Sequence, residues 1–169
     1  MPRADGIGQG IEVIVSTTIA PGESYALVLE SVRNIFPDFP DSTPKSTVSF
    51  PCSDKKITLR SEGLSLANFL SIAAQQRVLD TALDSMSKHL DKDKGTFSIS
   101  RQAALAEKIS FCRLDESVLG GIITITLKGL ELNEWIEEAT WHPGRDEFPR
   151  KVCDELSMSE DGEAITWID

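Results

Sequence analysis

The side chains that could carry out chemistry are few and lie far apart in this 169-residue chain. The histidines are His89 and His142, and the cysteines are Cys52, Cys112 and Cys153. No CxxC pair or histidine cluster occurs, so the spacing predicts neither a disulfide framework nor a zinc site. Cys112 stands on a predicted strand with no histidine near it, which is typical of a packing residue. We therefore expect reduced thiols, no metal and no cofactor.

A phosphate-binding glycine loop is also missing from the sequence. No GxxxxGK[ST] occurs, and the glycine-rich stretch at residues 6–10 precedes a predicted strand, whereas a dinucleotide-binding loop follows one. The sequence thus predicts no nucleotide kinase. We interpret the protein as a non-enzyme.

Two polar pairs interrupt otherwise apolar helical patterns: Gln76 with Arg77, and Arg101 with Gln102. One interpretation is structural, with Gln76 bonded to a buried backbone group and Arg77 paired with Asp80 or Asp84. The other is functional, with the two arginines beside a groove that holds phosphate. The sequence leaves both open.

The elements that must position these residues follow from hydrophobic periodicity. The longest is an uninterrupted amphipathic helix over 65–90, capped by Ser65. We expect further helices over 23–36, 101–108 and 130–140, and strands over 11–19, 46–50, 55–60, 96–100, 108–114, 121–129 and 164–168. Helices that share one sheet predict a two-layer α+β domain, with a mixed sheet and the helices on one face. We place this single domain at residues 1–142 and a polar, weakly ordered tail at 143–169.

Charge is distributed unevenly along the chain. The net charge is −10, made up of −3 over residues 1–50, +2 over 51–115 and −9 over 116–169. If the apolar residues of the strands face the helices, the opposite face is polar and positive, and it carries Lys56, Arg60, Lys108 and Lys128 among serines and threonines. That face has no aromatic residues, so the pattern favours contact with an RNA backbone over stacking of bases.

Three stretches resemble a known family. They are SLANFLSIAAQQRVLDTA (65–82), FSISRQAAL (97–105) and ISFCRL (109–114) followed by VLGGIITITL (118–127). The most specific residues are Gln76-Arg77, Arg101 to Ala104, and Leu119-Gly120. Over residues 10–140 the chain is similar to archaeal predicted RNA-binding proteins encoded beside or fused to dephospho-CoA kinase. The resemblance implies a fold similar to that of the ribosomal protein that binds five-S RNA, and a relation to archaeal exosome-associated RNA-binding proteins.

These observations give one main expectation and two alternatives. We expect a protein that binds structured RNA through Lys56, Arg60, Arg77, Arg101, Gln102, Lys108 and Lys128. The first alternative is a protein-interaction module whose C-terminal tail, with Trp141 and Phe148, binds a partner. The second is a small-molecule enzyme with a pocket near Gln76 and Arg77. Since no long apolar run or signal peptide is present, we expect a soluble, cytoplasmic protein with no membrane partner.

Overall fold

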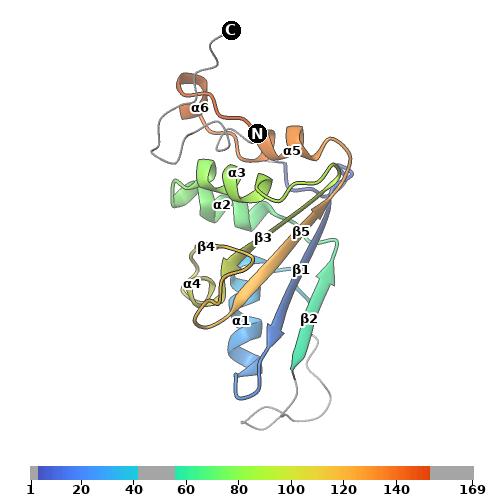
Figure 1. Ribbon diagram of the computed structural model, residues 1–169, viewed down its shortest axis with the longest axis vertical. Coiled ribbons are helices and arrows are strands. Elements are labelled where there is room, and N and C mark those ends of the chain that lie inside the picture. Colours follow the sequence, from blue (N-terminus) through green and yellow to red (C-terminus); the bar gives the residue numbers. More distant parts are fainter. Residues whose placement is uncertain (1–3, 42–55, 153–169) are drawn as a thin grey trace.

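The computed structural model describes residues 4–41 and 56–152 (Figure 1). The strands are β1 (Glu12–Ile19), β2 (Ile57–Glu62), β3 (Lys94–Ser100), β4 (Phe111–Cys112) and β5 (Ile122–Lys128). The helices are α1 (Tyr25–Ile35), α2 (Ala67–Gln75), α3 (Leu79–Ser87), α4 (Arg101–Leu105), α5 (Leu132–Ala139) and α6 (Gly144–Glu147). The strands predicted over 46–50 and 164–168 lie outside the described residues. Among the helices of the described part, none is long and apolar enough to pass through a lipid bilayer.

The five described strands form one sheet in the order β2-β1-β5-β3-β4. All the pairings among them are antiparallel. The described sheet is therefore antiparallel, where the sequence analysis expected a mixed sheet. Hydrophobic alternation predicts which residues of a strand face the core, but it carries no information on the direction of the neighbouring strand.

The sheet has one covered face and one open face, because successive side chains of a strand point to opposite sides. Val13 and Val15 of β1, and Ile123, Ile125 and Leu127 of β5, point toward the helices and are fully buried. The alternate positions are mostly polar and partly or fully exposed. In Figure 1 the helices gather on one side of the strands. The predicted two-layer α+β fold with its helices on one face is confirmed.

The long helix predicted over 65–90 is wrong, since the structure divides it into α2 and α3. Arg77 lies at the break with a φ of 59°, in the left-handed region. The Arg77 N–H donates to the Ala74 carbonyl, and the Val78 N–H donates to the Ala73 carbonyl. These two bonds form the Schellman motif, which ends many helices. Its left-handed position is usually glycine, so an arginine there gave no sequence signal of a helix end.

The strand predicted over 108–114 is much shorter in the structure, where β4 contains only Phe111 and Cys112. Gln76 explains the difference. Its side-chain amide donates to the Ile109 carbonyl at 3.1 Å and accepts from the Ile109 N–H at 2.7 Å. Because one side chain takes both backbone groups of Ile109, these groups are not used in the β-ladder. This confirms the structural interpretation of Gln76.

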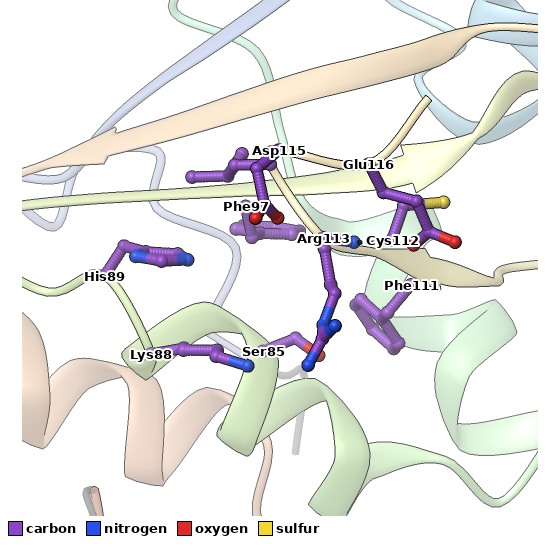
Figure 2. A pocket seen from close by; sticks show the side chains of 10 residues that line it. Ser85, Lys88, His89, Phe97, Phe111, Cys112, Arg113, Asp115 and Glu116 are labelled. Carbon is purple, nitrogen blue, oxygen red and sulfur yellow. Dashed lines mark hydrogen bonds between the residues drawn. The ribbon is translucent and has the colours of Figure 1, made fainter. Parts of the chain in front are cut away.

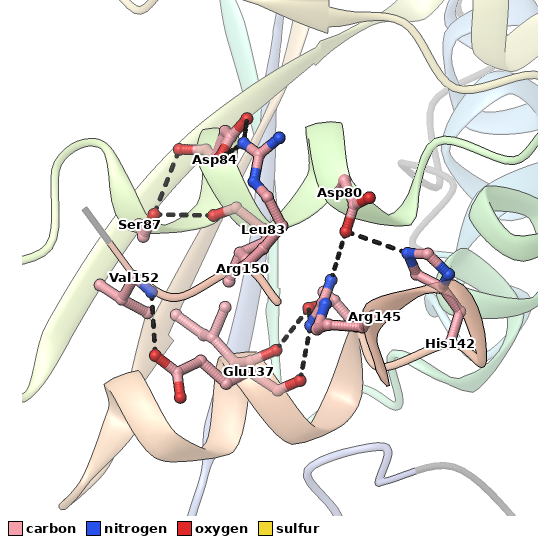
Figure 3. A network of polar contacts seen from close by, with 11 residues as sticks. Asp80, Leu83, Asp84, Ser87, Glu137, His142, Arg145, Arg150 and Val152 are labelled. Atoms are coloured by element: carbon pink, nitrogen blue, oxygen red, sulfur yellow. Dashed lines mark hydrogen bonds and ion pairs between the residues drawn. The ribbon is translucent and has the colours of Figure 1, made fainter. Parts of the chain in front are cut away.

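A C-terminal strap, which we define as residues 142–152, packs against the helical layer (Figure 3). Arg145 is buried and donates to Asp80 of α3 at 2.8 Å, and Arg150 donates to Asp84 at 2.6 and 2.7 Å. The backbone N–H of Val152 donates to the Glu137 carboxylate. The expected domain end at residue 142 thus falls at the start of a packed segment. The hydropathy pattern did not indicate that this segment packs, because its main contacts to the helices are ion pairs of charged side chains.

Candidate functional site

The open face of the sheet is lined mainly by hydroxyl side chains. They come from β1 (Ser16, Thr18), β2 (Thr58), β3 (Thr96, Ser98) and β5 (Thr124, Thr126). The strand register places Ser16 beside Thr124, and Thr124 beside Ser98. Two pairs lie within hydrogen-bonding distance: the Oγ1 atoms of Thr96 and Thr126, and Ser98 Oγ with Thr124 Oγ1, each pair at 3.4 Å. Ser98 is fully buried, whereas the other hydroxyl side chains of this face are partly or fully exposed. Neighbouring strands therefore present rows of accessible hydroxyl groups that end on β3 at Thr96.

Three of the predicted RNA-binding residues lie on or beside this face, but they are spread along its length. Arg60 follows Thr58 on β2 and pairs with Glu62, with 2.7 Å between Nη2 and Oε1. Lys128, at the end of β5, lies between Glu12 on β1 and Lys94 on β3. The four-residue step from Thr124, which shares the row of Arg60, to Lys128 spans about 13 Å. The cations of this face therefore do not form one cluster.

The remaining residue near this face is Lys56, which precedes β2 and is exposed. It lines a hollow of about 650 Å³ with Ser16, Thr18 and Thr124. The hollow is bounded on one side by the loop at residues 117–121. Lys56 thus lies where hydroxyl groups and an open space are adjacent.

Lys108 is not on the open face, contrary to expectation. It is exposed in the connection between α4 and β4, and its N–H donates to the Ala103 carbonyl at the end of α4. β4 and β2 form opposite edges of the sheet, so the whole width separates Lys108 from Arg60. The sequence analysis placed Lys108 in a strand over 108–114. In the structure Gln76 binds the backbone of Ile109, and the strand starts only at Phe111, so Lys108 lies before it.

Arg77 is exposed at the break between α2 and α3. The bonds between Gln76 and Ile109 bring Arg77 and Lys108 to the same edge, with Cα atoms within about 15 Å of each other. The expected pairing of Arg77 with Asp80 or Asp84 is not what the structure shows, because those carboxylates bind Arg145 and Arg150. Asp80 and Asp84 are thus bound by the C-terminal strap and not by Arg77.

Arg101 is a buried structural residue, and its side chain is only 5% exposed. Its Nε donates to the Gly120 carbonyl, one terminal nitrogen donates to Thr17 Oγ1 and the Thr18 carbonyl, and the other binds Glu23 at 2.6 Å. These contacts join β1, the start of α1 and the loop before β5. With four of its N–H groups used inside the protein, Arg101 is not placed to hold a phosphate.

Gln102 follows Arg101 and is exposed. It lines a hollow of about 330 Å³ together with Leu27, Leu105 and Leu119. This hollow lies beside α1 and α4, away from Lys128 at the far end of β5. Gln102 therefore does not join the hydroxyl rows in one site.

The structure also contains a groove that the sequence analysis missed (Figure 2). It has a volume of about 830 Å³ and lies between the C-terminal end of α3 and residues 111–116. Its lining residues are Ser85, Lys88, His89, Phe97, Phe111, Cys112, Arg113, Leu114, Asp115 and Glu116. They come from residues 85–89, from Phe97 on β3 and from residues 111–116, which show no common motif, so only the fold brings them together. We name this space the α3 groove.

The thiol of Cys112 in the α3 groove is not activated. Burial and the nearby Glu116 carboxylate raise the pKa of Cys112 above its ordinary value, which keeps the thiol protonated. Within the described residues, no group of three or more histidine, cysteine or acidic side chains could hold a metal ion. The described side chains therefore offer noncovalent binding groups and no activated cysteine nucleophile.

The comparison with family models found no match. A UPF0201 protein of Sulfurisphaera tokodaii is 33% identical over 133 residues, which cover 76% of this chain and 88% of the relative. A UPF0200/UPF0201 protein of Archaeoglobus fulgidus is 29% identical over 128 residues, or 72% of this chain. The matched stretch spans only 34% of that longer relative.

A solved structure of a protein with the same family name is also similar to this chain. The crystal structure of an uncharacterized UPF0201 protein superposes with a TM-score of 0.61 at 26% identity, over 77% of this chain and 94% of the other. None of these names mentions RNA, a kinase partner or the exosome, so those parts of the resemblance stay predictions. By identity and coverage, the chain belongs to the archaeal UPF0201 family.

Proposed function

We propose that this protein is a non-enzymatic RNA-binding protein that contacts the backbone of structured RNA with the open face of its sheet. The observation that carries the proposal is the set of hydroxyl rows on that face, flanked by lysines at both ends. Hydroxyl and ammonium groups bind phosphate oxygens and ribose hydroxyls. No aromatic side chain stands among the described strand residues of this face, which favours the backbone as the ligand.

The positions of the cations refine this mode of binding. Lys56 lies at one end of the face, and Lys94 with Lys128 lies at the other. Arg60 is already paired with Glu62, and Glu12 lies beside Lys128, so the face has a small positive surplus. About three phosphates would be neutralised, and log K against log salt would have a slope near −2 to −3. Binding of this kind is shape-dependent and weakly selective for sequence.

A filter-binding assay with a structured RNA hairpin at two salt concentrations tests the proposal. The double variant Lys56→Ala with Lys128→Ala removes two cations from the open face. We expect its affinity to fall and the salt slope to flatten by about two. Arg77→Ala with Lys108→Ala is the matched control, because it removes the same charge from the β4 edge.

The outcomes separate the two positions of the site. A large loss in the control, with the open-face variant unchanged, would place RNA on the β4 edge. If the wild-type protein shows no binding even at low salt, the RNA proposal fails. The control also corrects for the overall charge of the protein, which changes equally in both variants.

A protein-interaction module is the second candidate, favoured by two exposed aromatic residues. Trp141 is 46% exposed and Phe148 is 76% exposed, on either side of α6. Exposed aromatic side chains are common at the centres of protein interfaces. Replacing Phe148 with serine should abolish capture of such a partner and leave RNA binding unchanged.

A further inference from the structure

We propose that the α3 groove binds a nucleotide, with the phosphate at the α3 side and the base near Phe111 and the loop that follows it. This site lies at the β4 edge, apart from the hydroxyl rows of the open face, and does not depend on RNA binding there. Its volume of about 830 Å³ falls within the range of small-molecule sites. The groove has side chains suited to the phosphate and side chains suited to the base of such a ligand.

The phosphate end is supported by donors from two elements. In Figure 2 the guanidinium of Arg113 crosses the groove toward Ser85 on α3, and the side chain of Lys88 extends toward the same place. The ring of His89 faces the groove from the end of the helix. Arginine and lysine are the usual phosphate-binding side chains, and a serine hydroxyl adds a further donor. The side chains of Arg113, Lys88 and Ser85 therefore point to one part of the groove, where a phosphate would lie.

The base end is supported by an aromatic ring. Phe111 is half-buried, and its buried edge is held against Phe69 and Phe97, with ring centroids 6.2 and 6.3 Å away. Leu114 adds an apolar side chain that is 38% exposed. A ring fixed in this way offers a rigid surface to the flat face of a base, and such contacts stabilise single nucleotides.

The two carboxylates of the groove determine the orientation. Asp115 and Glu116 lie on the wall opposite α3, where they would repel a phosphate. The same carboxylates accept hydrogen bonds from the exocyclic amine of a base or from ribose hydroxyls. The arrangement thus favours a nucleotide whose base carries an exocyclic amine, such as adenine, with its phosphate toward Lys88 and Arg113.

Two sources could supply this ligand: a free mononucleotide, or an unpaired nucleotide at the end of an RNA. Calorimetric titration of the full chain with AMP, adenosine and inorganic phosphate tests the common chemistry. We expect AMP to bind at least about tenfold more tightly than either fragment, because only AMP contacts both ends of the groove. Competition of AMP with an RNA hairpin that has a single-stranded adenine overhang, and with a blunt hairpin, distinguishes the sources.

Variants identify the groove as the site. Arg113→Ala or Lys88→Ala should weaken AMP about tenfold and leave adenosine unchanged, since each removes a charged hydrogen bond to phosphate. The control Lys56→Ala with Lys128→Ala changes the charge of the open face and should leave AMP binding within about twofold. Asp115→Asn should alter adenosine binding and leave phosphate binding unchanged.

Each outcome bears on the proposal. Displacement of AMP by the overhang RNA alone supports the RNA end as the source, and lack of displacement by either hairpin supports the free nucleotide. The proposal is overturned if AMP binds no more tightly than inorganic phosphate, or if the open-face control weakens AMP as much as Arg113→Ala does. Failure of the open-face RNA assay would leave these titrations unaffected.

Discussion

At the scale of single residues, Arg101 shows how a sequence motif can point to the wrong role. A short helix that begins Arg-Gln-Ala-Ala looks like a place to hold a phosphate. In the structure Arg101 is buried and binds Glu23, Thr17 and two backbone carbonyls. The glycines before β5 belong to the same arrangement, since a Cβ on Gly121 would overlap the Arg101 guanidinium. Two of the three motifs that carry the family resemblance, Arg101 to Ala104 and Leu119-Gly120, therefore belong to one structural unit.

This close contact gives a prediction for Gly121. Its φ is +83°, and Gly121→Ala would both strain the backbone and displace the arginine. We expect a loss of about 2–4 kcal/mol in the free energy of unfolding, measured by urea denaturation. Gly63→Ala is the matched control, because Gly63 has a φ of +70° and open space around it. The control should lose only about 1 kcal/mol. Equal losses in the two variants would show that the Arg101 contact contributes nothing.

One of the two interpretations drawn from the sequence gives the role of Gln76, but neither gives that of Arg101, for a physical reason. A glutamine within an apolar helical stripe must satisfy its amide inside the protein, and it does so on Ile109. An arginine at a helix start is compatible with both exposure and burial. Its environment depends on Thr17 and Glu23, more than 75 residues away in the chain. Local sequence therefore could not decide the role of Arg101, nor show that Lys88 and Arg113 share a groove.

At the scale of elements, most of the predicted pattern is present. β1, α1, β5 and α5 lie within the predicted ranges, because alternation and helical spacing are strong signals when one face is buried. The main error is the helix over 65–90. The apolar stripe continues across Gln76 and Val78, so periodicity alone predicts an uninterrupted helix. The interruption depends on a single residue, Arg77, in a conformation that its side chain does not favour.

The break between α2 and α3 gives the next prediction. Arg77→Gly should raise the free energy of unfolding by about 1 kcal/mol, because glycine adopts the left-handed region without strain. Arg77→Ala is the control, since alanine removes the guanidinium but keeps the strain. It should be close to the wild-type protein in the same urea titration. A stability gain in Arg77→Ala as large as that in Arg77→Gly would mean that the charge of Arg77 is the destabilising feature.

At the scale of the whole molecule, the C-terminal strap is the last described segment and packs against the helical layer. Its basic side chains bind acidic side chains of α3: Arg145 binds Asp80, and Arg150 binds Asp84. Asp80 also accepts from His142 at 3.0 Å. Ser85 of α3 and Lys88 directly after the helix line the α3 groove, while Asp80 and Asp84 of α3 hold the strap. Loss of the strap would therefore affect the groove as well as the core.

Two truncated chains isolate the contribution of the strap. One ends at Val152 and keeps it, and the other ends at Thr140 and removes it. We expect the shorter chain to be less stable by about 2–4 kcal/mol at pH 7, because it lacks the buried Arg145 and the ion pairs on α3. Thermal unfolding of the two chains under identical conditions measures the difference. Coincident transitions would mean that the strap only rests on the surface.

The same pair of chains tests the part played by Asp80. Burial raises the pKa of Asp80, but hydrogen bonds from Arg145 and His142 outweigh it and hold the pKa below the ordinary value near 3.8. Stability from a carboxylate with a lowered pKa is present above the unfolded-state pKa and is lost as the pH falls through the folded-state pKa. The chain ending at Thr140 lacks both partners, so its stability has no such contribution. The difference between the chains should therefore shrink between about pH 4 and pH 2. A difference that stays constant over this range would assign the strap's effect to apolar packing instead of the Asp80 ion pairs.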